Sequence, residues 1–337
     1  MKPYQEKRHS RGDIGLDTGS HVLFGVTLAG TALFFPSVAA DPYLAAAVLT
    51  VSVAGSLAPD FDAVVRLRGK DAYLKHHRGI SHALPVWPVW AGGLAALAAW
   101  IWGTGEHALL LFGFALLAVA IHVLSDWTNA YGVQFLLPFR KEWLHLDAIC
   151  LTDPFLVAVH AGAIVASLPG GVDASPWLFA GAWSITAAYV GWRIAHHAIV
   201  ARRVRRRYRR ALAVHVLPGL WWFRWQFLVQ TDSGYEMGSI AGRRWLPCKH
   251  LPHAAAHECI EASRRSSSVQ TLKGFAKRAY ASWKEEANGD YLVTWTDLRF
   301  WRERDWPYRA EVRLDRQLNV IAEDIGWHKK AWEAPYV

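Results

Sequence analysis

Six long apolar segments dominate the first 200 residues and most restrict what this chain can fold into. They span residues 21–40, 43–58, 83–103, 107–125, 151–168 and 176–199. Most approach the roughly 20 residues that a helix needs to cross a ~30 Å hydrocarbon core. Buried helices of a large soluble protein are the alternative, but so many nearly uncharged segments would leave it almost no polar surface. We therefore expect an all-α polytopic membrane domain of about six transmembrane helices over residues 21–200.

Basic residues alternate with these segments. Lys and Arg occur in residues 1–20 and in the connections 59–82, 126–150 and 201–210, and none occurs at 41–42, 104–106 or 169–175. The positive-inside rule assigns the basic connections to the cytoplasm. We expect a multi-pass protein of a bacterial or archaeal cell (inner) membrane, with both termini cytoplasmic. The first 20 residues are polar, so a cleavable signal peptide is not expected.

The net charge of +9 is concentrated in the run "RRVRRRYRR" at residues 202–210. Such a run beside an apolar segment attracts anionic lipid, at about 1 kcal/mol per residue. A nucleic-acid patch is the alternative, but Tyr208 is the one aromatic residue in the run that a base can stack on. We therefore expect membrane lipid as a partner and do not expect nucleic acid.

The carboxy-terminal part has the composition of an ordinary soluble domain. Residues 222–230, 291–301 and 308–327 alternate β-branched and aromatic residues with polar ones, which predicts strands. Residues 268–289 resemble one amphipathic helix that ends at Asn288-Gly289. The sequence predicts a small cytoplasmic α+β domain over residues 211–337, after the basic juxtamembrane segment 201–210.

Most of the unusual polar residues of the apolar region fall at the cytoplasmic ends of the predicted helices. They are His21, Asp60, Asp62, His76, His77, Arg78, His82, His122, Asp126, Asp147 and Asp153. His122 and Asp126 are one helical turn apart on one helix face. Ionisable residues at a membrane boundary are costly and usually functional. Their convergence at one membrane face predicts a site assembled from several helix ends.

The residue types of this group predict a metal site. Histidine with carboxylate is the ligand set of Zn²⁺, and also of Mn²⁺ or Fe²⁺. We expect one or two divalent ions, with Zn²⁺ favoured. The predicted ligands are His21, Asp60, His76, His77, His82, His122 and Asp126. Which of the adjacent His76 and His77 binds is left open.

A bound ion of this kind activates water, and nearby groups complete a hydrolytic site. The predicted catalytic residues are Asp60 and Asp62, as carboxylates that can take a proton, and Arg78, which can bind an anionic group. The alternatives are structural: Asp60 or Asp62 can cap a helix or pair with Arg66, and Ser81 can be the N-cap of the third apolar helix or a nucleophile. His107 and His160 are out of register with the group, so we expect them to be structural.

A second histidine group lies in "CKHLPHAAAHEC", residues 248–259. His253 and His257 are four residues apart, and Cys248 and Cys259 flank them. A structural zinc is one interpretation, but the spacing fits no strong zinc-binding pattern. The favoured alternative is a solvated amphipathic helix. The three cysteines, with Cys150, show no spacing typical of a disulfide framework.

Four motifs in order resemble a known family. They are "SLAPDFDAVVR", "HHRGISHALPVW", "HVLSDWTNAYGVQFLLPF" and "HLDAICLTDP", within roughly residues 15–160. This order is similar to the bacterial inner-membrane family described as membrane-bound metal-dependent hydrolases, of the YdjM type. The resemblance implies a metal site in a membrane domain and leaves the substrate undefined.

A more distant similarity concerns the zinc-dependent phospholipase C and P1 nuclease superfamily. The order His21, Asp60, His76 or His77, then His122 and Asp126 is similar to the order of its zinc ligands. Carried over, Asp60, His77, His122 and Asp126 would surround one metal, and His21 with Asp126 would hold a second. The chain lacks that superfamily's amino-terminal Trp ligand and its later His and HxxxE ligands, so one or two ions are expected rather than three.

These features together predict a membrane-bound metal-dependent hydrolase that acts at the cytoplasmic membrane face. The expected substrate is a phosphoester or lipid-like molecule, because the site lies at headgroup depth and includes Arg78. Two alternatives belong to other classes. An ion transporter predicts polar residues at the bilayer midplane, where His160 alone would fall. A membrane anchor that binds a partner, with a structural metal, predicts a coordinatively closed site.

Overall fold

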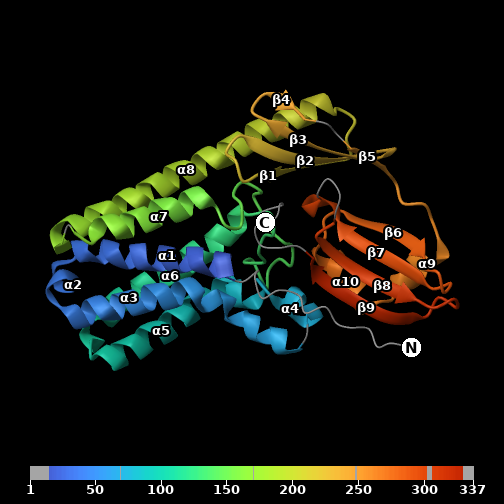
Figure 1. The fold of residues 1–337 in the computed structure, drawn as a ribbon. Coiled ribbons are helices and arrows are strands. Elements are labelled where there is room, and N and C mark those ends of the chain that lie inside the picture. The colour runs from blue at the N-terminus through green and yellow to red at the C-terminus, as the bar shows by residue number, and fades with distance from the viewer. Residues whose placement is uncertain (1–14, 69, 170, 247–248, 302–305, 329–337) are drawn as a thin grey trace. The chain divides into compact units, whose positions relative to one another are not determined.

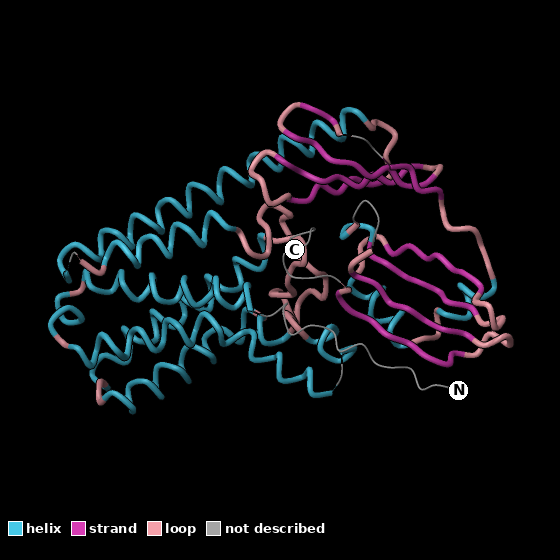
Figure 2. Tube along the Cα trace, viewed as in Figure 1, coloured by secondary structure: helices cyan, strands magenta, loops and turns pink. Residues whose placement is uncertain are grey.

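The computed structural model describes residues 15–68, 70–169, 171–246, 249–301 and 306–328. Among the described residues, those from 18 to 253 form one compact unit, and those from 254 to 328 belong to a second. Helices make up the amino-terminal part of the first unit, and strands follow them (Figure 2). The boundary between the units falls inside segment 211–337, which the sequence groups into one domain.

Each of the six apolar segments contains a helix (Figure 1). These helices are α1 (Gly15–Thr31), α3 (Pro42–Leu57), α5 (Trp87–Trp102), α6 (Ala108–Thr128), α7 (Pro154–Ser167) and α8 (Gly171–Arg207). Two short helices, α2 (Pro36–Ala40) and α4 (Lys70–His76), lie between them. The prediction of a helical amino-terminal domain is therefore confirmed.

Fewer helices than expected are long and apolar enough to cross a membrane. Within the described residues, three stretches meet that requirement: Pro42–Val65, Leu84–Trp102 and Gly105–Thr128. Thr18–Phe34 and Pro154–Ser167 are apolar but shorter. Length and composition thus support about three spans, and they do not confirm six.

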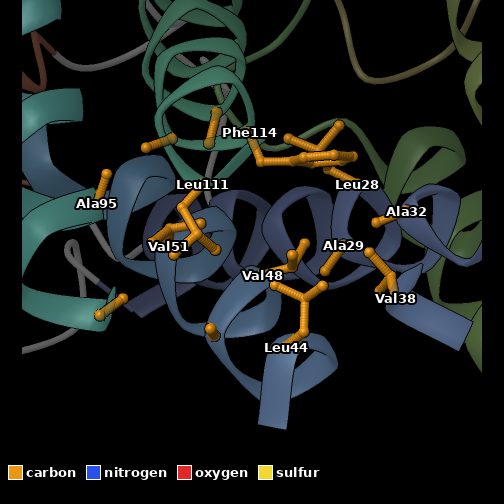
Figure 3. Close-up of a cluster of buried hydrophobic side chains, with 14 of the residues drawn as sticks. Leu28, Ala29, Ala32, Val38, Leu44, Val48, Val51, Ala95, Leu111 and Phe114 are labelled. Carbon is orange, nitrogen blue, oxygen red and sulfur yellow. The ribbon is translucent and has the colours of Figure 1, made fainter. Parts of the chain in front are cut away.

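Helices α1, α3 and α6 approach one another closely through small residues. Leu44, Val48 and Val51 of α3 form a buried cluster with Leu111 and Phe114 of α6 (Figure 3). A Cβ atom on Gly55 would lie 2.9 Å from the carbonyl oxygen of Ala115, and one on Gly25 would lie 2.8 Å from the Cα of Val53. Such close backbone approach is typical of helix packing in membranes.

Irregular segments follow α3 and α6. Pro59 lacks the N–H that an α-helix needs, and the chain continues after Leu57 as the 3₁₀ segment η2 (Ala58–Arg68). The short 3₁₀ turn η3 (Ile80–His82) comes shortly before α5. After α6, residues 129–153 form a loop in which Val133 pairs with Leu144. These segments carry most of the polar residues that the sequence singles out.

A five-stranded antiparallel sheet follows α8 in the same unit. Its strands are β1 (Ala213–Pro218), β2 (Arg224–Thr231), β3 (Gly234–Ala241), β4 (Arg244–Trp245) and β5 (Lys249–Pro252). The order is β1-β2-β3-β4, and β5 also pairs with β3. Val200 and Val204 near the end of α8 share a buried cluster with Phe227 and Ile240 of the sheet. Arg203 donates a hydrogen bond of 2.8 Å to the carbonyl of Gly242, so the sheet is fixed to α8.

The second unit is an antiparallel sheet with two helices. It contains α9 (Glu258–Ser263), α10 (Ser267–Phe275), β6 (Ala279–Glu285), β7 (Tyr291–Asp297), β8 (Tyr308–Leu314) and β9 (Val320–Trp327). The strands pair in sequence order, and α10 packs against β7, β8 and β9. The strands predicted at 222–230, 291–301 and 308–327 are confirmed by β2, β7, β8 and β9.

The prediction of one helix over residues 268–289 is wrong. Helix α10 ends at Phe275, and residues 279–285 form strand β6. Ala281 faces Trp295 and Trp283 faces Val293 in the β6–β7 pair. In β6, Ala279, Ala281 and Trp283 alternate with Tyr280, Ser282 and Lys284, so the sequence satisfies a strand pattern as well as a helical one. Cross-strand packing on β7 decides between them.

Candidate metal centre

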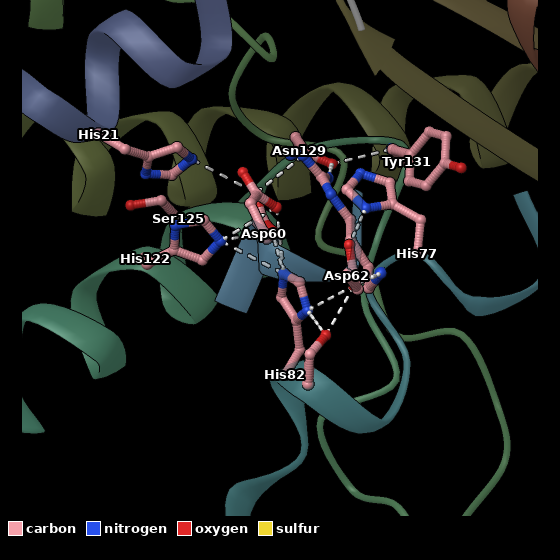
Figure 4. Close-up of polar contacts among 12 residues, drawn as sticks. His21, Asp60, Asp62, His77, His82, His122, Ser125, Asn129 and Tyr131 are labelled. Carbon is pink, nitrogen blue, oxygen red and sulfur yellow. Dashed lines mark hydrogen bonds and ion pairs between the residues drawn. The ribbon is translucent and has the colours of Figure 1, made fainter. Parts of the chain in front are cut away.

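Helix ends and turns bring predicted ligands together at one place (Figure 4). Asp60 and Asp62 lie in η2, directly after α3, and His82 lies in η3. His122 and Asp126 lie in the last two turns of α6, one turn apart on one face. The cluster thus depends on where α3 and α6 end.

Asp60, His82, His122 and Asp126 each offer one ligand atom, and these atoms lie within 4.8 Å of one another. His82 Nε2 is 3.3 Å from His122 Nε2, 3.3 Å from Asp126 Oδ2 and 3.6 Å from Asp60 Oδ1. His122 Nε2 is 3.6 Å from Asp60 Oδ1 and 3.5 Å from Asp126 Oδ2. A tetrahedral ion with bonds of about 2.0–2.2 Å separates its ligand atoms by about 3.3–3.6 Å. Five of the six separations among the four ligand atoms thus match a tetrahedral metal site, and the sixth is within 4.8 Å.

The outer nitrogens of both histidines are already bonded, which fixes their tautomers. His122 Nδ1 donates to the backbone carbonyl of Ser56 at 2.7 Å. His82 Nδ1 donates to the hydroxyl of Ser81 at 2.9 Å, and that hydroxyl donates to Asp62 Oδ2 at 2.6 Å. Both Nε2 atoms therefore present lone pairs to the centre of the group. Outer hydrogen bonds of this kind are usual for metal-binding histidines.

Several atoms at the centre have no hydrogen-bond donor. Asp60 Oδ1 and Asp126 Oδ2 are buried, and neither accepts a hydrogen bond from the described part of the chain. Two lone-pair nitrogens and two carboxylate oxygens at these distances repel one another unless a cation lies between them. The group therefore fits a divalent cation by its donor set as well as by its spacing.

The other oxygen of Asp126 bonds to an arginine. Arg78 donates to Asp126 Oδ1 at 2.9 Å and to Asn129 Oδ1 at 3.3 Å, and its guanidinium lies 5.0 Å from the ring centre of Tyr131. The Arg78 side chain is buried, and its φ of 59° is in the left-handed region. Charge pairing and hydrogen bonds at the centre compensate that backbone conformation.

Asp62 organises the turn beside the cluster. Its Oδ1 accepts from His77 Nδ1 at 2.7 Å, and its Oδ2 accepts from the backbone N–H of Arg78 at 3.0 Å. Asp60, Asp62 and His77 form a second group whose ligand atoms lie within 4.8 Å, so Asp60 belongs to both groups. His76 is exposed and belongs to neither. Of the adjacent pair, it is His77 that the fold turns toward the site.

His21 of α1 lies against the four-ligand group without being part of it. Its ring stacks on His122 at 4.0 Å between centroids, and its Nε2 is 3.9 Å from Asp126 Oδ1. Of the seven predicted ligands, four thus form one group, His77 joins the second, His21 lies beside the first and His76 lies outside both. The predicted catalytic residues Asp60, Asp62 and Arg78 all lie in this network.

Other polar residues that the sequence places at this membrane face do not join the centre. Asp153 caps α7 by accepting from the N–H of Phe155, and it also accepts from the Tyr189 hydroxyl at 2.8 Å. Asp147 pairs with His145 at 2.8 Å. His160, expected to be structural, is buried and bonds to Thr27 and Thr186, at 2.7 and 2.9 Å.

Two local predictions are wrong. Ser81 does not cap the third apolar helix, because α5 begins at Trp87 and the Ser81 hydroxyl bonds to Asp62 instead. Residues 249–259 are not one amphipathic helix, because Lys249–Pro252 is strand β5 and α9 begins at Glu258. His257 caps α9 and stacks on Trp283 at 3.8 Å.

The zinc alternative at residues 248–259 gains no support. Among the described residues, no three histidine, cysteine or carboxylate side chains come together around His253 and His257. Cys248 lies outside the described residues. Cys150 and Cys259 are both buried.

Three contacts at the site were not predicted from the sequence. The carbonyl of Ser56 holds His122, Asn129 holds Arg78, and Tyr131 lies over the guanidinium. A backbone carbonyl leaves no mark in the sequence. Asn129 does leave one, since it lies three residues after Asp126, at the carboxy-terminal cap of α6.

Comparison with known proteins agrees with the resemblance seen in the motifs. The family described as YdjM inner membrane protein matches residues 16–200, and the YfhP C-terminal alpha/beta plait domain matches residues 258–333. The uncharacterized protein YfhP of Bacillus subtilis (strain 168) is 29% identical over 321 residues, which cover 93% of this chain and 95% of that protein. No solved structure matches.

The two matched regions agree with the structure. Residues 16–200 contain the helices and the four-ligand group, and residues 258–333 contain the α10 and β6–β9 unit. The more distant similarity to the phospholipase C and P1 nuclease superfamily stays a prediction. The protein belongs to the YdjM inner membrane protein family, with a carboxy-terminal alpha/beta plait domain of the YfhP type.

Proposed function

We propose that this protein is a membrane-bound metal-dependent hydrolase that acts on a phosphoester at the cytoplasmic membrane face. One observation carries the proposal: four lone-pair atoms of Asp60, His82, His122 and Asp126 converge at the spacing of a tetrahedral ion. The proposal includes six membrane crossings with both termini in the cytoplasm, as the basic connections indicate. Zn²⁺ is the favoured ion, because its ligands are histidine and carboxylate in a tetrahedron.

Local charge supports a cation at this place. Asp60, Asp62 and Asp126 carry three carboxylates, and Arg78 is the one guanidinium that contacts them among the described side chains. Neutral histidines, as metal ligands require, leave two negative charges without compensation. Uncompensated buried carboxylates cost several kcal/mol each, so a divalent ion would stabilise the folded site.

The chain's own residues can prepare a hydrolysis. A divalent ion held by the four-ligand group would supply Lewis acidity to the reacting phosphoester and its attacking water. The Ser56 carbonyl and the Ser81–Asp62 pair hold the two histidines in place. Asp60 is the ligand that solvent reaches, since its side chain is 22% exposed and those of His82, His122 and Asp126 are at most 1% exposed.

The reaction needs no further reagent. The oxygen of one water molecule forms a bond to phosphorus, and the bond from phosphorus to the ester oxygen breaks. The leaving alcohol takes up one of the water's protons, and the phosphate product keeps the new oxygen. Asp60, the partly exposed carboxylate of the site, is placed to accept that proton and to return it to the leaving alcohol.

The test combines metal content with activity. The full chain, purified in detergent, is expected to contain about one or two Zn²⁺ ions per molecule and to hydrolyse phosphomonoesters or phosphodiesters. His122→Ala and Asp126→Ala should lose both the metal and the activity. His76→Ala is the matched control, because His76 is exposed in the same region and should keep both. Unchanged metal content in the two ligand variants would refute the ligand assignment.

A second candidate is a membrane anchor with a structural metal. It is favoured by the number of ligands, since four protein ligands close a tetrahedron, whereas catalytic zinc sites usually keep three and leave one position open. On this hypothesis the metal is lost in His122→Ala and the folding stability falls with it. Wild-type protein that holds its metal and hydrolyses no phosphoester would support the anchor over the hydrolase.

A further inference from the structure

We propose that the substrate is a phospholipid, held with its phosphoester at the four-ligand group and its acyl chains on an exposed apolar rim beside it. This inference rests on the proposed hydrolase function. The apolar rim consists of Phe61 (72% exposed), Val64 (57%), Leu67 (89%), Ile80 (70%) and Leu84 (47%). Large exposed apolar patches mark places where a protein meets a ligand, a partner or a membrane.

The rim alternates with the residues of the metal centre along the chain. Phe61 stands between Asp60 and Asp62, and Ile80 stands two residues before His82. Asp60 and Asp62 of η2 and His82 of η3 take part in the metal-ligand groups, whereas Phe61, Val64, Leu67 and Ile80 of the same segments are exposed. A molecule that reaches the site therefore meets polar and apolar surface within one or two residues.

Trp90 of α5 contacts both segments that carry the rim, η2 at Phe61 and η3 at Ser81. Its ring centre lies 6.4 Å from that of Phe61, and its indole N–H donates to the carbonyl of Ser81 at 3.1 Å. Phe61 and the Ile80–Ser81 turn are thus both placed against the beginning of α5. Phe61 and Ile80 of the rim are therefore neighbours in space although 19 residues separate them in the chain.

The partly exposed member of the four-ligand group adjoins this rim in the chain. Asp60 is the partly exposed member of the four-ligand group, and it directly precedes Phe61. The side chains of the other three ligands are at most 1% exposed. A substrate would have to approach past Asp60, which places its uncharged part on Phe61 and its neighbours.

The rim also continues the apolar surface of two candidate membrane spans. Phe61 and Val64 fall inside Pro42–Val65, and Leu84 begins Leu84–Trp102. An acyl chain on the rim can therefore stay in the hydrocarbon region while the headgroup enters the site. Each buried CH₂ contributes about 0.8 kcal/mol, so contact with part of one chain is enough to favour a lipid over a water-soluble phosphoester.

The experiment compares substrates that share a headgroup and differ in acyl chains. Phosphatidic acid is paired with glycerol 3-phosphate, and phosphatidylglycerol with glycerophosphoglycerol, all presented to the full chain in mixed micelles with Zn²⁺. The variants are Phe61→Ser and Ile80→Ser. Leu109→Ser is the matched control, because Leu109 is 83% exposed at the other end of α6.

For wild type we expect a kcat/KM on one of the lipids that is at least about tenfold above that on its soluble partner. Each rim variant should lower kcat/KM on the lipid by about tenfold, mainly through KM, and leave the soluble substrate and the metal content unchanged. Leu109→Ser should change none of these values. Because both rim residues are exposed, the variants should also keep the melting temperature of wild type.

Three results would overturn the inference. Hydrolysis of the soluble partners as fast as the lipids would show that the acyl chains are not bound, although the hydrolase would stand. Rim variants that lower kcat/KM equally on a lipid and on its soluble counterpart would show that the rim serves a protein partner or folding instead. Retained metal with no hydrolysis of either pair would refute the proposed function together with the inference.

Discussion

The two oxygens of Asp126 have different partners, and the difference explains why this residue sits at the centre. Oδ1 accepts from Arg78, and Oδ2 faces His82 and His122 without a hydrogen bond from the described residues. The arginine fixes the orientation of the carboxylate, so the second oxygen is held in place for a cation. A carboxylate without such a partner would rotate away or take up a proton.

Asp62 is expected to tune metal affinity without binding the ion of the four-ligand group. Asp62→Asn keeps the size of the side chain but replaces one of its two acceptor oxygens with an amide group. Either the bond from His77 or the bonds from Arg78 and Ser81 are then lost, and the Ser81 hydroxyl that accepts from His82 is held less firmly. We expect metal affinity to fall by about 10–100-fold, measured by competition with a chelator. Asp41→Asn, which caps α3 at its other end, is the control and should bind metal as wild type does.

At the residue scale, the spacing of His122 and Asp126 could be predicted from the sequence because helical periodicity puts them on one face. The choice between His76 and His77 could not. Residue 77 lies at the end of α4, and its direction depends on the hydrogen bond to Asp62, fifteen positions earlier in the chain. Neighbouring histidines look alike until a tertiary contact selects one of them.

At the element scale, the contact between α3 and α6 depends on Gly55. Gly55→Ala should destabilise the protein by about 1–3 kcal/mol, because its Cβ would press on the backbone oxygen of Ala115 at 2.9 Å. Gly113→Ala in α6 has no atom within 4 Å of its new Cβ and should be neutral or stabilising, as alanine favours helices. Thermal unfolding in detergent measures both. Equal effects of the two changes would contradict the packing described for α3 and α6.

The turn between β8 and β9 should respond to pH. The backbone N–H of Asn319 donates to Asp315 at 2.8 Å, and this bond with those from the Asn319 side chain and Gln317 N–H holds the pKa of Asp315 below its ordinary value of 3.8. The charged form is therefore favoured in the fold. Its contribution is fully present above pH 3.8 and is lost as the pH falls through the lower folded value.

Hydrogen exchange checks this turn at neutral pH. In Asp315→Ala the amides of Gln317 and Asn319 should exchange faster than in wild type, while the paired strand residues keep their protection. Ser282→Ala, on a strand of the same sheet, serves as the control. Slow exchange at both amides in the Asp315 variant would contradict the capping role.

The elements themselves were accessible from the sequence where one period dominates. Six apolar segments each hold a helix, and the strands β2, β7, β8 and β9 follow their alternating patterns. The misassigned segment 268–289 shows the limit. Residues 279–285 satisfy two periods, and pairing with β7, which lies later in the chain, decides their structure.

For the whole molecule, the basic connections lead to a topology that can be measured. Fusions of a cytoplasm-specific fluorescent reporter after residue 210 or 337 should fluoresce, and fusions of a periplasm-specific phosphatase at 105 should be active. The three stretches that meet the length and apolarity requirement leave the other three crossings open. A phosphatase active after residue 337 would rule out an even number of crossings with a cytoplasmic amino terminus.

Helix α8 has 37 residues and is therefore about 55 Å long, about 25 Å more than the ~30 Å hydrocarbon core that it crosses in the proposed six-span topology. Its far end is locked to the β1–β5 sheet by the Val200 and Val204 contacts and by Arg203. We therefore expect the helix and the sheet to move together as one rigid body. In the proposed topology, a tilt of α8 by about 10° would move its carboxy-terminal end and the sheet by about 10 Å, so we expect a change in bilayer thickness to displace the sheet.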